Sequence, residues 1–434
     1  MKKISFIGAG SFQFTTAVVK DLALFPAFND AHICLMDINS HNLTEITKCV
    51  ERIKNEMNVN FKITATTSRE EALSNADAVL CMVFNGDVDI WRHEIEIPKK
   101  YGVDINIGDT RSVSGIFRAL RNIPLMLEIC SDIERICPKA VFLNYTNPMS
   151  MLCKAMQTLT NVDVTGLCHS VQGTSEMLAK WAGKDYSTIK YTCVGINHLA
   201  FFSEITSNGE DIYPIIREKI KEPEIYDEER VRNELFKMFG FYVTESSGHN
   251  SEYTPWFRKK PEYIEKYCKG TSWNPGEYAF SLKQRLYSDR FDNNIKDWFK
   301  KPLDKNKSHE YAADIINARI GDNTPFEFNA NVLNNGSVEN LPENACVEIP
   351  VIAEKDGYKR IFSGNMPAVP ATYVSFVAGI ENLVFEAFLE KSREKVIQAV
   401  SLDPLCGAVL SLEEIRNMCN ELFEVNKEYL GDYK

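Results

Sequence analysis

The sequence predicts an α/β fold in which a doubly wound parallel sheet is followed by an α+β lobe. Short, almost continuously apolar runs alternate with helical patterns through residues 1–185, as expected of parallel strands that are buried on both faces. The first of these runs ends in a glycine turn. From residue 191 the pattern changes to paired, antiparallel-looking runs followed by helices. We therefore predict two domains, residues 1–190 and 191–434.

The first unit reads as strand, glycine turn, helix and strand. Residues 3–8 end in the turn Gly8-Ala9-Gly10-Ser11, a helical pattern then stops at Pro26, and the apolar run 32–38 carries Asp37 near its end. This arrangement is typical of a Rossmann-like nucleotide fold, similar to that of lactate/malate dehydrogenase, although Gln13 replaces the third glycine of the usual pattern. An acid at Asp37 favours NAD, because it accepts hydrogen bonds from a ribose. The candidate cofactor-binding residues are Gly8, Gly10, Ser11, Phe12 and Asp37; the alternative is an ordinary turn between a strand and a helix.

The remaining elements follow in order. Further buried strands are expected at 62–67, 76–84, 139–147 and 164–170, with helices around 69–76, 114–136 and 149–159. The run at 191–205 begins the second lobe. The lysine-rich stretch 296–307 is expected to be a solvated loop, and the apolar segment 371–389 either a core helix or a dimer interface.

Composition excludes several classes of partner. The chain has 49 Lys and Arg against 60 Asp and Glu, a net charge of −11, which argues against nucleic acid and anionic membranes. Its twelve cysteines contain no CxxC pair and several lie in apolar runs, which favours a reducing cytoplasm. The N-terminal apolar stretch is too short for a secretion signal, and we expect no membrane span.

Polar residues follow several of the predicted strands, at the edge where doubly wound sheets bind ligands. They comprise Asn144 to Pro148, Cys168 to Ser170, Asp109 within 108–115, Asn197-His198, and the aromatic segment 249–257. Each has a purely structural alternative. Cys168 and His198 are 30 positions apart and could be a buried thiol and a core histidine. Asn147-Pro148 could be a cis-prolyl turn, and Asp109 could be a capping residue. The aromatic segment could be a lid or a subunit contact.

Seven motifs in the same chain order resemble glycoside hydrolase family 4: GAGSF, GDT, RALRNIP, NYTNPM, GLCHSVQGT, GINHLAFF and ESSGHNSEYTPWF. The resemblance covers essentially the whole chain. The tetrad Cys168-His169-Ser170-Val171 is similar to that of melibiase-type α-galactosidases, whereas the phosphoglycosidase branches carry Asp or Asn after the cysteine.

The resemblance implies an NAD- and metal-dependent hydrolysis of α-galactosides by oxidation, elimination, addition and reduction. It implies a divalent metal, such as manganese, on Cys168 and His198, which would polarise the sugar oxygens. Asn147 would bind the sugar and His169 would protonate the leaving oxygen. For the base that removes the proton from carbon 2, Tyr253 is favoured over His249 and Glu252. Asp109 would lie near that base.

One loop departs from the family pattern. The family commonly reads GDTxGPGG, whereas residues 108–115 lose a proline and two glycines and introduce Arg111. This departure leaves the geometry of the loop, the role of Asp109 and the preferred aglycone open.

Three rival functions follow. An α-glucosidase, α-galacturonidase or phospho-α-glucosidase would keep the mechanism and change the sugar, with Arg92, Arg111 or Arg290 binding an anionic group; Arg290 is the candidate substrate-binding arginine. A lactate/malate-type dehydrogenase shares the fold but has no use for Cys168. A non-catalytic NAD sensor would carry a degenerate site. The expected partners are a small oligosaccharide and further copies of the chain, as a homo-dimer or homo-tetramer.

Overall fold

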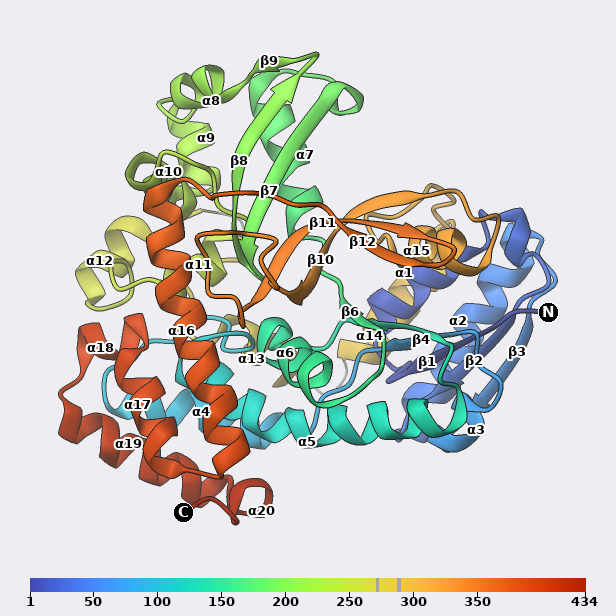
Figure 1. Ribbon diagram of the computed structural model, residues 1–434, viewed down its shortest axis with the longest axis horizontal. Coiled ribbons are helices and arrows are strands. Elements are labelled where there is room, and N and C mark those ends of the chain that lie inside the picture. The colour runs from blue at the N-terminus through green and yellow to red at the C-terminus, as the bar shows by residue number, and fades with distance from the viewer. Residues whose placement is uncertain (271–272, 287–289) are drawn as a thin grey trace.

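The computed structural model describes residues 1–270, 273–286 and 290–434. One mixed sheet runs through the whole molecule in the order β3-β2-β1-β4-β5-β6-β10-β11-β7-β8-β9, with β12 paired to β11 (Figure 1). The strands are β1 Lys3–Ile7, β2 His32–Met36, β3 Lys62–Thr66, β4 Ala78–Cys81, β5 Val141–Asn144, β6 Val164–Gly166, β7 Ile189–Ile196, β8 Leu199–Ser207, β9 Glu210–Asp211, β10 Phe326–Leu333, β11 Cys346–Glu354 and β12 Gly357–Arg360.

The first six strands are parallel, which confirms the doubly wound sheet predicted from the sequence. Their residues alternate between two cores: Ile4 and Phe6 of β1 pack with α1 and α2, whereas Val79 and Cys81 of β4 pack with α5 on the other face. The helices of this half are α1 Phe12–Leu22, α2 Ser40–Met57, α3 Arg69–Leu73, α4 Val88–Lys100, α5 Ser112–Ile136, α6 Met149–Leu159 and α7 Ser170–Ala182, with short 3₁₀ turns at Pro26–Phe28 and Tyr186–Thr188.

The strands of the second half extend the same sheet. Strands β7 and β8 form the antiparallel hairpin expected from residue 191 onward, and β10 pairs antiparallel with β11. A single pairing, Asn331 with Gly166, joins β10 to β6. A Cβ at Gly166 would lie 2.5 Å from the sulfurs of both Cys153 and Met149, so only glycine fits where the two halves meet.

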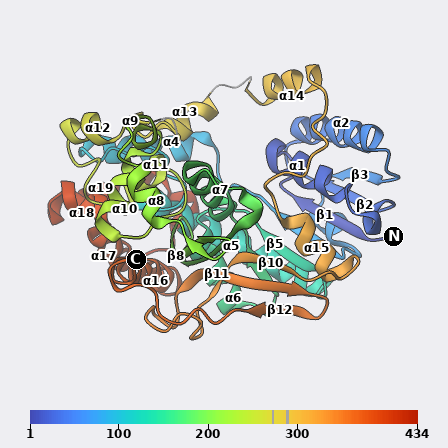
Figure 2. The same ribbon diagram turned by 90° about the horizontal axis from the view of Figure 1, so that it is seen from above.

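Most helices of the second half surround this extension on the side away from the N-terminus, whereas α14 and α15 pack against α2 and α1 of the first half (Figures 1 and 2). The helices of the second half are α8 Tyr213–Lys219, α9 Pro223–Glu228, α10 Arg230–Phe239, α11 Ser247–Tyr253, α12 Pro261–Tyr267, α13 Phe280–Leu286, α14 Arg290–Lys300, α15 Ala312–Ile320, α16 Ala368–Glu390, α17 Arg393–Leu402, α18 Pro404–Val409, α19 Leu412–Val425 and α20 Lys427–Leu430.

The lysine-rich stretch is not simply a solvated loop. Its first residues belong to α14, which packs against α2 at the far side of the nucleotide fold (Figure 2). Trp298 of α14 meets the ring of Phe12 edge-on at 5.9 Å. The following loop returns to the end of α1, where Ser308 donates its backbone N–H to Asp21 at 2.9 Å. The prediction failed because lysine stems and apolar neighbours on one helix face can pack even where the charges stay in water.

Helix α16 contains the apolar segment 371–389. An 18-residue window of this helix reaches a mean hydropathy of 1.4, and half of the window is buried inside the protein. The expectation that no segment has the length and apolarity of a membrane span is therefore wrong for α16. Its inner face contacts α5, α6 and α17, as a core helix would, while Val369, Phe376 and Leu389 stay exposed.

Candidate active site

The glycine turn after β1 has the geometry of a nucleotide cradle. Gly8 has φ +83°, and a Cβ there would lie 2.4 Å from the carbonyl oxygen of Met82. A Cβ at Gly10 would lie 2.7 Å from Oδ2 of Asp37, which already accepts the N–H of Gly10 at 2.8 Å. Ser11 precedes α1 without capping it, so its side chain does not occupy the first amides of the helix. These features fit the pyrophosphate and ribose of a dinucleotide.

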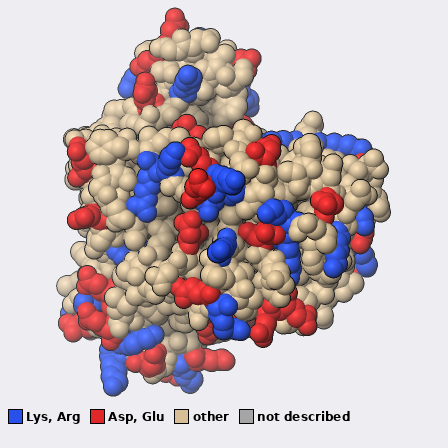
Figure 3. Space-filling model, turned by 45° about the vertical axis from the view of Figure 1, so that its right-hand side comes forward, with Lys and Arg blue, Asp and Glu red and all other residues tan. Residues whose placement is uncertain are grey.

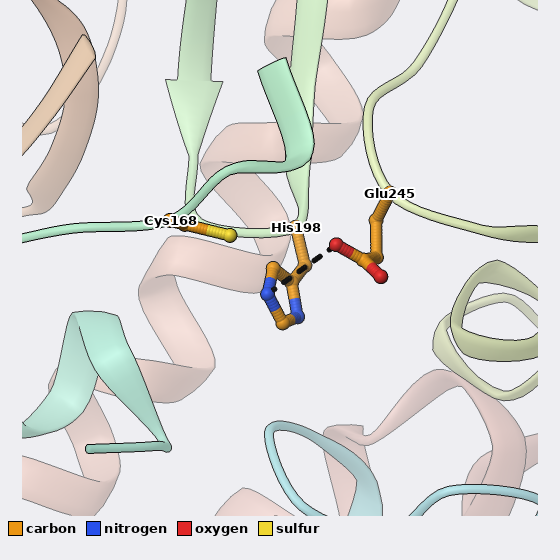
Figure 4. A group of neighbouring side chains, drawn as sticks. All are labelled: Cys168, His198 and Glu245. Atoms are coloured by element: carbon orange, nitrogen blue, oxygen red, sulfur yellow. Dashed lines mark ion pairs between the residues drawn. The ribbon is translucent and has the colours of Figure 1, made fainter. Parts of the chain in front are cut away.

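Beyond the ends of β6 and β7, Cys168 and His198 converge. A third residue, Glu245, joins them, and the sulfur, a ring nitrogen and a carboxylate oxygen all lie within 4.8 Å of one another (Figure 4). Oε2 of Glu245 is 3.5 Å from Nε2 of His198. Glu245 is the first residue of the motif ESSGHNSEYTPWF, but the sequence alone assigns no role to its carboxylate. Its place directly before a segment of candidate bases is the one sequence feature that points to a role in the site.

Neighbouring hydroxyl groups fix the orientation of the His198 ring. Nδ1 of His198 is 3.3 Å from Oγ1 of Thr110, and that hydroxyl donates its proton to Oδ1 of Asp109 at 2.8 Å. Thr110 can therefore only accept from Nδ1–H, which leaves Nε2 as the free lone pair facing Glu245 and Cys168. Burial lowers the pKa of His198 well below its ordinary value, so the imidazole is neutral, as a metal ligand must be.

The thiol of Cys168 is equally buried. Desolvation raises the pKa of this thiol well above its ordinary value, and nearby carboxylates raise it further. A divalent cation supplies the opposite influence and would hold the sulfur as a thiolate. The donor set of one thiolate, one imidazole and one carboxylate suits a transition-metal dication.

The structure separates the three candidate bases. Both carboxylate oxygens of Glu252 are occupied by backbone N–H groups of Asn106, Ile107 and Gly108, at 2.7 to 2.9 Å. The carboxylate of Glu252 therefore fixes the backbone of residues 106–108, which leads into Asp109. This geometry argues against Glu252 as the base.

Tyr253 and His249 both lie beside the converging ligands. The hydroxyl of Tyr253 is 3.4 Å from Nδ1 of His198. The ring of His249 lies between two carboxylates, with Nδ1 3.1 Å from Oε1 of Glu245 and Nε2 3.8 Å from Oδ1 of Asp109. Asp109 is thus close to both remaining base candidates.

In the loop that departs from the family pattern, Ser112 has a backbone conformation that favours glycine. Ser112 has φ +61°, in the left-handed region that glycine adopts without strain. The side chain of Arg111 turns inward, where Nη2 donates to Oε1 of Glu381 at 3.0 Å and the guanidinium carbon lies 5.0 Å from the centre of the Tyr253 ring. The new arginine therefore supports the segment that carries Tyr253.

His169 is held from a direction that the sequence did not indicate. Its Nδ1 lies 3.1 Å from Oε1 of Glu310, in the loop before α15. This hydrogen bond raises the pKa of His169, which favours the protonated form that a general acid needs. About half of the side chain stays exposed, so the ring can reach a substrate.

The two candidate substrate-binding residues differ in their surroundings. Asn147 forms a cis peptide bond with Pro148, and its Oδ1 is buried without a hydrogen-bond partner in the part of the chain that the structure describes. Arg290, the first residue of α14, donates to the carbonyl oxygen of Gln284 at 2.6 Å. That contact does not link Arg290 to the Cys168 group, and its role in substrate binding stays a prediction.

A buried acid behind the ligands was also missed. Glu348 of β11 is fully buried, and neither of its carboxylate oxygens has a hydrogen-bond partner among the described residues. Burial raises the pKa of Glu348 to about 8, and the charge of Glu245 adds to the shift.

Comparison with known proteins gives two matching family models. The model described as family 4 glycosyl hydrolase matches residues 3–184, and the model of the family 4 glycosyl hydrolase C-terminal domain matches residues 193–406. An α-galactosidase of Bacillus subtilis is 38% identical over 446 residues and covers 100% of both chains. An α-galactosidase of Rhizobium meliloti is 33% identical, covering 99% of this chain and 89% of its own. An α-galacturonidase of Thermoanaerobacter italicus is 27% identical, covering 99% and 97%.

Solved structures share the fold. A 6-phospho-α-glucosidase from gut microorganisms, crystallised with NAD and Mn²⁺, superposes with a TM-score of 0.82 at 19% identity over 99% of this chain and 98% of its own. Malate dehydrogenase from Plasmodium falciparum gives a TM-score of 0.52 at 14% identity over 92% and 100%. The predicted similarity to the dehydrogenase fold is therefore confirmed at a lower level than that to the glycosidases.

Proposed function

The chain belongs to glycoside hydrolase family 4, and from this premise we propose that it is an α-galactosidase that removes terminal α-D-galactosyl groups from small oligosaccharides with NAD and a divalent metal. The observation that carries the proposal is the convergence of Cys168 and His198 at the carboxyl edge of a sheet whose first turn fits a dinucleotide, with His169 directly after Cys168 in the chain. The α-galactosidase relatives and the Cys168-His169-Ser170-Val171 tetrad support galactose as the sugar.

The glycine turn and Asp37 would hold NAD. When bound, NAD supplies a hydride acceptor that oxidises a ring carbon of the sugar and later returns the hydride. Gly8 and Gly10 allow the backbone to approach the pyrophosphate, because a side chain at either position would collide with neighbouring oxygens. The loop around Ser308, tied to the end of α1, keeps this helix fixed against the second half of the molecule.

Cys168 and His198 would hold the metal, proposed to be Mn²⁺ or another divalent cation. Such a cation would polarise the oxygens on carbons 2 and 3 of the sugar. Within the described residues, Oδ1 of Asn147 is a buried acceptor with no partner, so it is available to a sugar hydroxyl.

The remaining steps are proton transfers by this chain's own residues. His169, whose pKa is raised by its hydrogen bond to Glu310, is proposed to give a proton to the leaving oxygen. Tyr253 is proposed to remove the proton from carbon 2 as its phenolate. Burial, and after it the charge of Asp109, raise the pKa of the Tyr253 hydroxyl, which makes the phenolate a stronger base. Arg111 acts in the opposite direction, and this cation and a bound divalent metal would favour formation of the phenolate.

The surroundings of two arginines support a neutral sugar over an anionic one. Arg111 is paired with Glu381 inside the protein, and Arg92 lies on α4 beside Asp89 and Glu96. Because both arginines are already paired with carboxylates, neither is free to bind a phosphate or uronate group. Of the three candidate arginines, Arg290 is then the one left to bind a charged substrate.

Location and assembly are proposals as well. All twelve cysteines are buried and unpaired, which supports a reducing, cytoplasmic location. Figure 3 shows acidic and basic side chains interspersed on the face in view, which supports a small-molecule partner over nucleic acid. The exposed apolar residues of α16 support a homo-dimer or homo-tetramer.

The proposal is tested by following the release of nitrophenol from nitrophenyl α-galactoside while NAD⁺, Mn²⁺ and a thiol reductant are withheld in turn. We expect activity to disappear when any one is absent, with no net formation of NADH. Activity that persists without NAD⁺ would contradict the proposed mechanism. Cleavage of an α-galacturonide or a phosphorylated α-glucoside in place of the galactoside would identify one of the rival substrates.

A further inference from the structure

We propose that Glu245 is a third protein ligand of the divalent cation, so that the chain itself supplies one sulfur, one nitrogen and one oxygen donor. This inference rests on the metal-dependent function proposed above and goes beyond it, because that function requires only Cys168 and His198. The side chains of all three residues point toward a common centre (Figure 4).

The spacing of the donor atoms suits one shared cation. Ligands at about 2.0 to 2.3 Å from a tetrahedral dication lie about 3 to 4 Å from one another. Oε2 of Glu245 is 3.5 Å from Nε2 of His198, and the three donor atoms lie within 4.8 Å of one another.

The backbone fixes Glu245 in this position. The N–H of Thr244 donates to the carbonyl oxygen of Ala200 at 2.8 Å, and the Thr244 hydroxyl accepts the N–H of Ala200 at 3.2 Å. Val243 also pairs with Phe201. The residues before Glu245 are therefore attached to the start of β8, directly after the turn that carries His198.

Both His198 and Glu245 adopt left-handed backbone conformations, with φ of +60° and +69°. Such conformations are costly for residues other than glycine, and in folded proteins they concentrate where a side chain must be aimed for function. Two of them on adjacent segments, each directing a donor atom to the same centre, indicate a built site rather than a chance approach of an acid and a histidine.

The second oxygen of Glu245 lies beside His249. Oε1 is within ion-pair distance of Nδ1 of His249, at 3.1 Å, and the same ring reaches toward Asp109 on its other side. The hydrogen-bond partner of this Nδ1 is Oγ of Ser246, at 2.8 Å, which fixes the ring next to the carboxylate. His249, one of the three candidate bases, is therefore placed to orient Glu245, as neighbouring groups orient the carboxylates that ligate metals.

The test is Mn²⁺ affinity, measured without substrate from the electron paramagnetic resonance signal of free Mn²⁺ in titrations of chelator-treated, NAD-saturated protein. Glu245→Gln should raise the Kd for Mn²⁺ at least about tenfold, and His249→Gln by several-fold. Glu204→Gln, which changes an exposed acid of β8, is the matched control and should leave the Kd unchanged. Cys168→Ser should weaken binding at least as much as Glu245→Gln.

A Kd for Glu245→Gln within twofold of the parent, together with a large loss in Cys168→Ser, would overturn the third ligand and leave the proposed function standing. A parent protein that binds no Mn²⁺ or other divalent cation would overturn both. If Glu245→Gln does not fold, Glu245→Asp loaded with Co²⁺ replaces it. The shorter acid should then change the visible d–d bands while the thiolate charge-transfer band persists, and unchanged d–d bands would contradict the assignment.

Discussion

One carboxylate oxygen of Glu252 accepts the backbone N–H of Gly108 at 2.9 Å, which joins the segment that carries Tyr253 to the segment that carries Asp109. The other oxygen accepts two further amides of the same loop, those of Asn106 and Ile107. This buried carboxylate sets the distance between the proposed base and its neighbouring acid.

We expect Glu252→Gln to destabilise the protein by roughly 2–4 kcal/mol and to lower kcat. An amide presents an NH₂ group to backbone donors, so at least one buried N–H would lose its acceptor. Urea unfolding and steady-state kinetics measure the two effects. Glu262→Gln in α12, at an exposed acid, is the control and should change neither. A stability of Glu252→Gln equal to that of the parent would show that these three hydrogen bonds are dispensable.

The Arg111–Glu381 pair is expected to matter far more than exposed pairs. Both side chains are at least 93% buried, so Glu381→Gln would leave a buried guanidinium without its counter-charge. We expect a loss of roughly 3–5 kcal/mol, measured by denaturant unfolding. Arg135→Ala, which removes a surface pair with Glu70, should cost less than about 1 kcal/mol. Similar losses for the two variants would contradict the structural role given to Arg111.

Glu348 should make the metal-free protein less stable as the pH rises. Its folded pKa is about 8 against an ordinary 4.5, so between these values the folded chain holds a proton that the unfolded chain has released. The free energy of unfolding must then fall as pH increases through this window. Thermal unfolding of chelator-treated protein from pH 5 to 8.5 should show this fall, and Glu348→Gln should reduce it. An equal pH dependence in both proteins would assign the effect to other groups.

Gly10→Ala should weaken NAD binding by at least about tenfold, because the new methyl group would lie 2.7 Å from Oδ2 of Asp37 in the cofactor turn. Fluorescence titration with NADH measures the change. Gly379→Ala in α16 adds the same methyl group where nothing lies within 4 Å and should leave binding unaltered. Unchanged affinity in Gly10→Ala would place the cofactor elsewhere.

The sequence predicts correctly which polar residues follow a strand, while their roles stay predictions. Cys168, Asn147 and Asp37 each end an apolar run, and the carboxyl ends of parallel strands meet at one edge of the sheet. The parallel direction of the first six strands is predicted from the same pattern.

Prediction from the sequence failed where a role depends on contacts between distant segments. Glu310 contacts His169 although the two residues are 141 positions apart in the chain. No local sequence pattern predicts that pairing. Glu245 gains its role from the attachment of its segment to β8. Glu252 is a candidate base from the sequence because it lies in the segment that resembles the family's base loop, but its direction is set by the amides of residues 106–108.

The central claim is that the glycosidic bond breaks only after the neighbouring carbon has lost its proton. Cleavage of an α-galactoside in D₂O, with NAD⁺ and Mn²⁺ present, tests it through the isotopic composition of carbon 2 in the released galactose, read by NMR. A ketone next to carbon 2 makes that proton exchangeable, so the account predicts galactose carrying deuterium at carbon 2. Released galactose that keeps its original proton at carbon 2 would contradict the account.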